Sequence, residues 1–240
     1  MRAPFYLNIT TRTVKPRVLK MVEIRNEFGF LFSTIDAANH LEEVFRLRFE
    51  IYVEELGFLS PEDYPFPKEI DKFDAASVHI AAINPKNKIV GAVRLVFHSP
   101  LGFPLEDHCN YPIFWGRRFP ERQCVAEVSR LVIHKQYRRK ILHPVFGFSS
   151  INTGLCDEIN PIILGLYSIG HQISRERNIT HWIAAMDSGL VRLVKRRGFM
   201  FQPIGETINY YGKVRPYIIE IEEIQKYMMA QDQKNAFTSA

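Results

Sequence analysis

The sequence lacks a long apolar run. Its longest apolar stretches have the length of strands; residues 90–97 and 214–221 are examples, and each of these two is broken by charge. A membrane-spanning helix needs about 20 apolar residues, so no transmembrane segment is predicted. The basic N-terminus also lacks an apolar core followed by a small-residue cleavage site, which a signal peptide requires. The sequence therefore predicts a cytoplasmic protein.

Cysteine is scarce as well. Cys109, Cys124 and Cys156 are odd in number and show no Cys-x-x-Cys spacing. This favours reduced thiols over a disulfide framework or a zinc site, and no other cluster with ligand spacing predicts a metal. The net charge of +5 excludes few classes of binding partner. Nucleic acid, an anionic membrane surface contacted peripherally and an acidic carrier protein would all be attracted by it.

Core-forming residues are abundant, with 46% hydrophobic and 12% aromatic residues in a chain of 240. This supply suits one large domain. Residues 1–20 are basic and aperiodic, which predicts a loosely ordered arm, and the last residues, 226–240, are polar and predict a tail. The domain itself is expected over residues 21–225.

Hydrophobic periodicity predicts the elements of this domain. The expected helices cover residues 35–56 with Asp36 as N-cap, 161–178, and 189–197, where Gly198 ends the helix. The expected strands cover residues 77–84, 88–98, 124–133, 180–186, 199–210 and 214–221, and residues 141–155 are expected to be a mobile loop. This order predicts an α+β or mixed-sheet architecture around one sheet.

Charged residues inside the apolar segments indicate a site. Arg94 lies in the middle of an apolar strand, where an unpartnered guanidinium would be costly, so it should contact carboxylates. Glu127 and Arg130 share the next strand. Residues three apart face opposite sides of a strand unless the strand is bulged, so one of the two is expected to enter the core.

Two further pairs of polar residues precede these strands. Arg48 and Tyr52 are four apart and share a helix face, and Asp71 and Asp74 follow on a loop. With Arg94, Glu127 and Arg130, the charged members of these pairs could form an internal salt-bridge lattice that only holds the fold in register. They could equally build a reactive site.

Taken together, these residues resemble those of the acyl-homoserine-lactone (autoinducer) synthases. That family has an Arg, two aromatic residues, two Asp, an Arg and a Glu-x-x-Arg in this order, here Arg48, Tyr52, Phe58, Asp71, Asp74, Arg94, Glu127 and Arg130. Nearly the whole chain is also similar to the acyltransferases associated with exosortase and PEP-CTERM systems, and its later stretches to N-acyl amino acid synthases as well. The phrases that carry this similarity are residues 47–52, 73–79, 91–96, 180–186 and 211–217.

The resemblance implies a bacterial acyltransferase with the GNAT fold, a central mixed and mostly antiparallel sheet with a splayed strand, flanked by helices. It implies no tightly bound cofactor, a fatty acyl donor on phosphopantetheine and an amine acceptor. Glu127 would be the general base beside Arg130 or Arg94, and the backbone of Leu131, Val132 and Ile133 would bind the thioester. The acceptor pocket would be shaped by Arg48, Tyr52, Phe58, Asp71 and Asp74.

One departure from the GNAT pattern concerns the donor. Ordinary GNAT enzymes follow the splayed strand with a loop whose small residues let the backbone cradle the coenzyme A pyrophosphate. Here Ile141 and His143 occupy those positions and would hinder close approach. The cations Arg138, Arg139 and Lys140 can still hold a single phosphate, which favours an acyl carrier protein over coenzyme A. The alternative is a solvated turn or a nucleic-acid patch, but the mixed charges elsewhere argue against nucleic acid.

A second departure concerns the acceptor. The autoinducer synthases tend to have Phe and Trp where this chain has Tyr52 and Phe58, which weakens the case for S-adenosylmethionine. An amino acid or a related small amine is at least as consistent with the residues. Two alternatives stay open: an acyl-homoserine-lactone synthase that uses S-adenosylmethionine, and a non-catalytic GNAT-fold protein that binds an acyl carrier or lipid. Tyr167 and Ser168 are weaker candidates for a general acid.

Overall fold

A computed structural model describes residues 22–109, 119–138, 161–196, 198–210 and 212–226 of the chain. The predicted N-terminal arm, the loop over 141–155, the cations Arg139 and Lys140, and all but the first residue of the C-terminal tail lie outside these residues.

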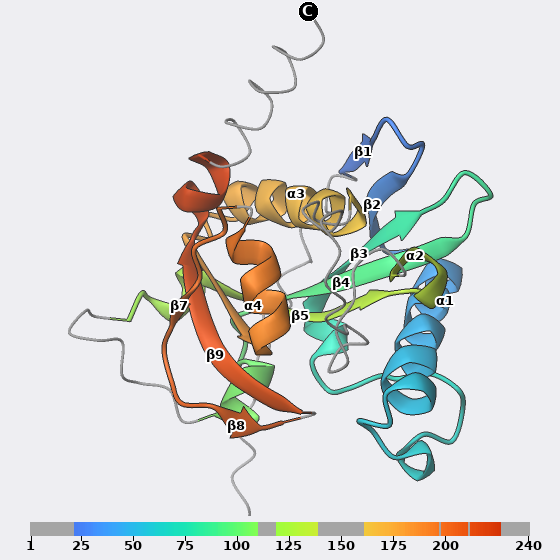
Figure 1. The fold of residues 1–240 in the computed structure, drawn as a ribbon, viewed down its shortest axis with the longest axis horizontal. Helices are drawn as coiled ribbons and strands as arrows, with labels where there is room; N and C mark the ends of the chain where they lie inside the picture. The colour runs from blue at the N-terminus through green and yellow to red at the C-terminus, as the bar shows by residue number, and fades with distance from the viewer. Residues whose placement is uncertain (1–21, 110–118, 139–160, 197, 211, 227–240) are drawn as a thin grey trace, which may run out of the picture.

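A single nine-stranded sheet organises the domain (Figure 1). The strand order is β1-β2-β3-β4-β5-β6-β9-β7, and β8 pairs with β9. Only the β5–β6 pair is parallel, so the sheet is mixed and mostly antiparallel. The strands are β1 (Glu23–Arg25), β2 (Leu31–Ile35), β3 (Ser77–Ile83), β4 (Ile89–Phe97), β5 (Val125–Ile133), β6 (His181–Met186), β7 (Gln202–Pro203), β8 (Ile208–Asn209) and β9 (Lys213–Glu220).

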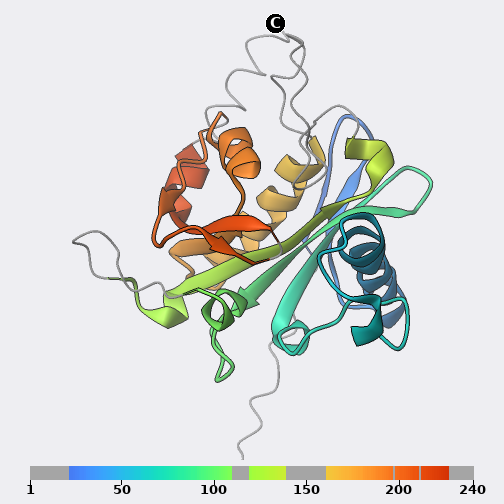
Figure 2. The same cartoon turned by 60° about the horizontal axis from the view of Figure 1, so that its bottom comes forward.

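Helices cover both faces of the sheet (Figure 2). Helix α1 (Ala38–Phe49) continues into a π-helical segment, Glu50–Glu55, and packs on one face. Helices α3 (Pro161–Glu176) and α4 (Ser188–Lys195) pack on the other, and the short α2 (Lys135–Arg138) follows β5. Because neighbouring side chains of a strand point to opposite faces, Ile80 contacts the α3 core whereas Ala81 contacts the α1 core. This two-sided burial explains why the central strands are almost continuously apolar.

Helix α3 approaches the sheet closely at Gly165. A Cβ atom built there would lie 2.3 Å from the Cζ atom of Phe32, whose side chain is only 1% exposed. A glycine inside a helix is usually unfavourable relative to alanine. At this position its lack of a side chain leaves room for the Phe32 ring.

Gly165→Ala is therefore expected to destabilise the protein, although alanine is the better helix former. The buried ring cannot move away without disturbing its neighbours, and overpacking of this kind costs about 1–3 kcal/mol. Urea unfolding would measure the loss. Gly170→Ala is a matched control in the same helix, because the nearest atom to its Cβ would be 3.3 Å away. Equal effects of the two substitutions would contradict the expectation.

The structure confirms most predicted elements and corrects three. Strands β3, β4, β5, β6 and β9 and helix α3 lie where the sequence places them, within two residues at each end. Asp36 is not the N-cap of α1: Ala37 occupies that position and no side chain caps the helix. Residues 199–210 contain only the two-residue strands β7 and β8, and β1 and β2 lie where no strand is predicted. No described helix is long and apolar enough to cross a membrane.

Candidate active site

Strands β5 and β6 diverge in the middle of the sheet. They pair only where Val125–Glu127 faces His181–Ile183, yet β5 runs on to Ile133 and β6 to Met186. The predicted splayed strand is therefore present. Beyond Glu127 the edge of β5 that faces β6 has no strand partner among the described residues, which leaves backbone groups available to a ligand.

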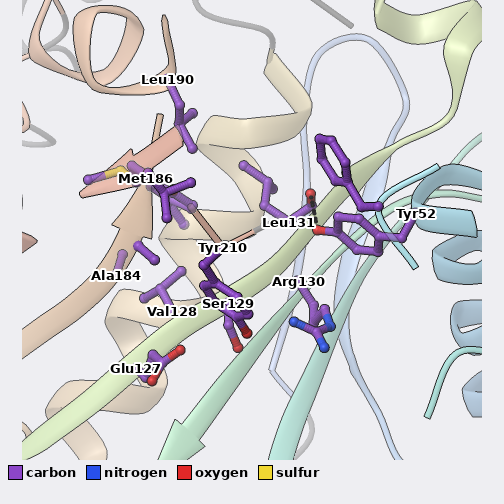
Figure 3. A pocket seen from close by; sticks show the side chains of 14 residues that line it. Tyr52, Glu127, Val128, Ser129, Arg130, Leu131, Ala184, Met186, Leu190 and Tyr210 are labelled. Atoms are coloured by element: carbon purple, nitrogen blue, oxygen red, sulfur yellow. Dashed lines mark hydrogen bonds between the residues drawn. The ribbon is translucent and has the colours of Figure 1, made fainter. Parts of the chain in front are cut away.

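A pocket lies in this fork, and we call it the fork pocket (Figure 3). It encloses about 80 Å³, well below the roughly 300–1,000 Å³ of typical ligand pockets, so it can hold the reacting groups but not a whole fatty chain. Its lining comes from β5, β6, α3, α4, the π-helical segment and the β8–β9 hairpin: Tyr52, Phe58, Glu127–Leu131, Tyr167, Ala184–Met186, Leu190, Tyr210 and Val214.

Glu127 is the acid of the fork pocket. Its side chain is buried, and its Oε2 accepts a hydrogen bond of 2.8 Å from the backbone N–H of Leu105, in the 3-10 helix Pro104–Asp107. Burial raises the pKa of Glu127 to about 8, against the opposing effects of that hydrogen bond and of Arg94 and Arg130. No described residue hydrogen-bonds its Oε1. Glu127 can therefore exchange a proton near neutral pH.

A β-bulge shapes the strand next to Glu127. Ala92 pairs with Val132 and Arg94 with Ser129, so Val93 alone faces the two residues Arg130 and Leu131. Arg130 has φ +53°, a left-handed conformation that is uncommon for a residue with a side chain. Such strain costs about 1–3 kcal/mol and persists only where the surroundings enforce it. The bulge also changes which side chains of β5 point to each face of the sheet, because it adds one residue to the strand.

Behind the pocket, three arginines and three carboxylates form an ion cluster in which all members but Arg130 and Asp71 are buried. Arg48 binds Asp74 at 2.7 Å and also binds Glu69, and Arg94 binds Asp71 at 2.6 Å and Asp74 at 2.8 Å. Arg130 completes the cluster with contacts of 3.1 Å to both Glu69 and Asp71. The charges balance, three positive against three negative, which is what makes burial of so many ions tolerable.

The pKa values within the cluster reflect this pairing. Burial would raise the pKa of Asp74, but Arg48 and Arg94 hold it well below its ordinary value. Burial likewise opposes the ionisation of Arg130, yet Glu69 and Asp71 keep the pKa of its guanidinium well above the usual value. All members with a shifted pKa remain charged at neutral pH, so the ion cluster is a fixed frame rather than a proton relay.

A second, apolar pocket lies where the far end of β5 meets α3 and α4, and we call it the donor-side pocket. It is lined by Ile51, Leu131, Val132, Ile133, Arg138, Ile163 and Leu190. It shares Leu131 and Leu190 with the fork pocket. Arg138 forms an ion pair there with Glu55 of the π-helical segment. The residues predicted to bind the acyl donor that the structure describes, Leu131, Val132, Ile133 and Arg138, therefore all line this pocket.

The other predicted site residues lie in the fork pocket or in the ion cluster. Glu127, Arg130, Tyr52 and Phe58 line the fork pocket, whereas Arg48, Asp71, Asp74 and Arg94 lie in the ion cluster behind it. Glu127 forms no ion pair with Arg94 or Arg130, unlike the arrangement that the sequence suggests. Figure 3 shows the Arg130 guanidinium lying apart from the Glu127 carboxyl.

Sequence reasoning missed two features of this region. Glu69 is completely buried and holds both Arg48 and Arg130. Counting charges does not indicate it, because the lattice expected from the sequence already balances with Glu127 as its third carboxylate. Tyr210 lines the fork pocket and stacks on His108, with ring centroids 3.8 Å apart. No sequence signal singles out this pair, because it joins two loops. Among the described residues, no group of three or more His, Cys, Asp or Glu could hold a metal ion.

A family model connects this geometry to known proteins. Residues 47–144, which include the ion cluster, β3, β4 and the bulged β5, match the model of the Acetyltransferase (GNAT) domain. No curated protein matches the sequence.

Solved structures match over most of the chain. The acyl-homoserine-lactone synthase LasI is 16% identical, with a TM-score of 0.57 over 84% of this chain and 91% of that one. FeeM, an N-acyl amino acid synthase from uncultured soil microbes, is 13% identical, with a TM-score of 0.56 over 84% and 96%. BjaI, a CoA-dependent acyl-homoserine lactone synthase solved with SAM and isopentyl-CoA, is 19% identical, with a TM-score of 0.54 over 79% and 80%. The chain has the GNAT acyltransferase fold; the resemblance to the PEP-CTERM-associated group stays a prediction.

Proposed function

We propose that this chain is an N-acyltransferase that moves a fatty acyl group from an acyl carrier protein to the amine of an amino acid or a related small amine. The observation that carries the proposal is Glu127. It is a buried carboxyl with a pKa of about 8, it lines the fork pocket, and directly after it begins the edge of β5 that has no strand partner in the part of the chain that the structure describes.

In the proposed reaction, the acceptor nitrogen attacks the thioester carbonyl in the fork pocket. The C–N bond forms, and the Glu127 carboxylate accepts the proton that the nitrogen loses, directly or through a water. Backbone N–H groups of β5 near Leu131–Ile133 stabilise the oxyanion of the tetrahedral intermediate. The C–S bond then breaks, and the phosphopantetheine sulfur leaves as a thiol by taking up the proton that Glu127 had accepted, which restores the carboxylate. A positioned base of this kind accelerates a reaction by about 10²–10⁴-fold.

The residues around the donor-side pocket support a phosphopantetheine donor, which would lie against them, since the pocket encloses only about 20 Å³. Its walls are apolar apart from Arg138, and it adjoins the fork pocket through Leu131 and Leu190. Arg138 can bind one phosphate by exchanging the Glu55 carboxylate for it. A phosphopantetheine arm carries one phosphate, and its acidic carrier protein would be attracted by the net charge of +5. We therefore place the acyl carrier protein ahead of coenzyme A as donor.

The acceptor would enter beside Tyr52, Phe58 and Tyr210, the aromatic residues of the fork pocket. The ion cluster, whose charges already balance, would shape this pocket without binding the acceptor through a spare charge. S-adenosylmethionine is the alternative acceptor. It is favoured by the match of the site residues to the autoinducer synthase pattern and by the fold shared with LasI and BjaI.

Mass spectrometry of lipid extracts tests the proposal. Cells that express the chain are compared with cells that express Glu127→Gln, and we expect an N-acyl amino acid only in the former. An acyl-homoserine lactone would instead identify S-adenosylmethionine as the acceptor. The donor is tested with purified protein, acyl carrier protein and coenzyme A loaded with the same acyl chain, and we expect faster transfer from the carrier protein. No acylated amine in cells and none in vitro would refute the proposal.

A further inference from the structure

Besides the ion pairs that Arg130 makes with Glu69 and Asp71, the side chain of Tyr52 holds the bulge of β5. The Tyr52 hydroxyl donates a hydrogen bond of 3.1 Å to the carbonyl oxygen of Leu131, across 79 residues of sequence. The guanidinium carbon of Arg130 lies 5.7 Å from the centroid of the same ring. Tyr52 therefore contacts both residues that oppose Val93, one through its hydroxyl and the other through its ring (Figure 3).

The surroundings of Tyr52 fit this contact. It lies in the π-helical segment Glu50–Glu55, and π-helical turns inside α-helices are frequent at functional sites. Its backbone carbonyl accepts a hydrogen bond of 2.9 Å from the N–H of Phe58, which fixes the chain that follows. Burial raises the pKa of Tyr52 to about 12, so the hydroxyl keeps its proton and stays a donor at neutral pH.

The strained residue needs such a restraint. Arg130 has φ +53°, and an unrestrained strand would relax towards regular pairing. A one-residue change of register would turn the side chains of β5 to the opposite face. It would also alter which N–H groups face the fork between β5 and β6, where the thioester carbonyl would lie.

We propose that Tyr52 is a positioning residue: its hydroxyl and ring clamp the Arg130–Leu131 bulge so that the β5 edge presents its backbone to the acyl donor. The proposal rests on the acyl transfer proposed above. It assigns the hydroxyl of Tyr52 to the strand and not to the acceptor. It also gives a physical meaning to the tyrosine at a position where the autoinducer synthases tend to have phenylalanine.

Tyr52→Phe is the appropriate test, because it removes the hydroxyl and keeps the ring against Arg130. We expect kcat to fall about 10-fold, the cost of about 1.4 kcal/mol in barrier height, with the acceptor KM and the thermal midpoint little changed. Hydrogen exchange at the amides of residues 130–133 should become at least several-fold faster. Tyr217→Phe is the matched control: Tyr217 lies on β9, outside the lining of the fork and donor-side pockets, and should leave both readouts unchanged.

The outcomes separate the two proposals. Unchanged kcat and unchanged exchange in Tyr52→Phe would overturn the clamp. A lower kcat with unchanged exchange would also overturn it, because the hydroxyl would then act on a substrate. Faster exchange in a protein whose wild type transfers no acyl group would support the clamp and refute the proposed function.

Discussion

Glu127→Gln is expected to lower kcat for acyl transfer by about 10²–10⁴-fold, the contribution of a positioned general base. Glutamine keeps the size of the side chain and an oxygen that can accept the hydrogen bond from the Leu105 N–H. The fork pocket should therefore keep its shape, and KM for the donor should change little. Steady-state kinetics with a carrier-bound acyl donor would measure both constants.

The pH dependence identifies the role of Glu127 further. Its pKa of about 8 means that the carboxylate needed for catalysis accumulates as the pH rises. The wild-type kcat should therefore rise with pH and reach half of its maximum near pH 8, and the residual rate of Glu127→Gln should lack this dependence.

The same substitution should stabilise the fold. Glu127 has a folded pKa of about 8, above its ordinary value of 4.5. Below the ordinary value both folded and unfolded chains hold the proton, whereas between the two values only the folded chain does. The wild type therefore loses stability as the pH rises through this window. Glutamine does not titrate, so Glu127→Gln should unfold with a higher free energy at pH 8 than the wild type, by on the order of a few kcal/mol.

A control separates this effect from a general change in acidity. Glu121→Gln removes an exposed carboxylate that does not line the fork pocket and should change neither kcat nor stability. Wild-type kcat in Glu127→Gln would show that another group accepts the amine proton. If Glu127→Gln were less stable than the wild type at pH 8, burial would not destabilise the ionised Glu127 carboxyl.

Glu69→Gln is expected to lower the free energy of unfolding by about 3–5 kcal/mol, the usual cost of removing one partner from a buried ion pair. Glu69 is completely buried and holds both Arg48 and Arg130. Without its charge, the three guanidinium groups of the ion cluster would face only Asp71 and Asp74. Urea unfolding at neutral pH would measure the loss.

The matched control is Glu42→Gln. Glu42 also pairs with an arginine, Arg46, but both side chains are exposed to solvent, and such pairs contribute little to stability. Its free energy of unfolding should stay close to that of the wild type. A Glu69→Gln variant as stable as Glu42→Gln would mean that the ion cluster does not depend on charge balance.

The sequence predicts the central strands well because their signal is local. Residues 88–98 and 124–133 are apolar runs of strand length, and the structure has β4 and β5 there. Arg94 within such a run indicates buried carboxylate partners, and Asp71 and Asp74 are indeed its partners. The strands β1 and β2 were not predicted, because pairing of β2 with β3, and of β1 with β2, supplies the stabilisation that a short segment lacks by itself.

The start of α1 shows the limit of local rules. Asp36 has the right chemistry for an N-cap, but β2 runs to Ile35 and the helix begins only at Ala38. The strand pairing of Ile35 with His79 fixes the chain immediately before Asp36. Tertiary context therefore decides where the helix begins.

The amino-acid sequence by itself determined a mixed α+β sheet and the charged residues Arg94, Glu127 and Arg130 within its strands, because apolar periodicity and charges inside apolar strands are properties of neighbouring residues. The GNAT fold and the other predicted site residues followed from the resemblance to the autoinducer synthases. Only the tertiary structure decided which of these groups line the fork pocket and which form the ion cluster. It placed Glu127 in the fork pocket and apart from the arginines, and it brought Glu69 to Arg130. It also tied Tyr52 to Leu131. Such contacts join residues far apart in the chain, and their geometry depends on a bulge and on a divergence of strands that appear only when the sheet is assembled.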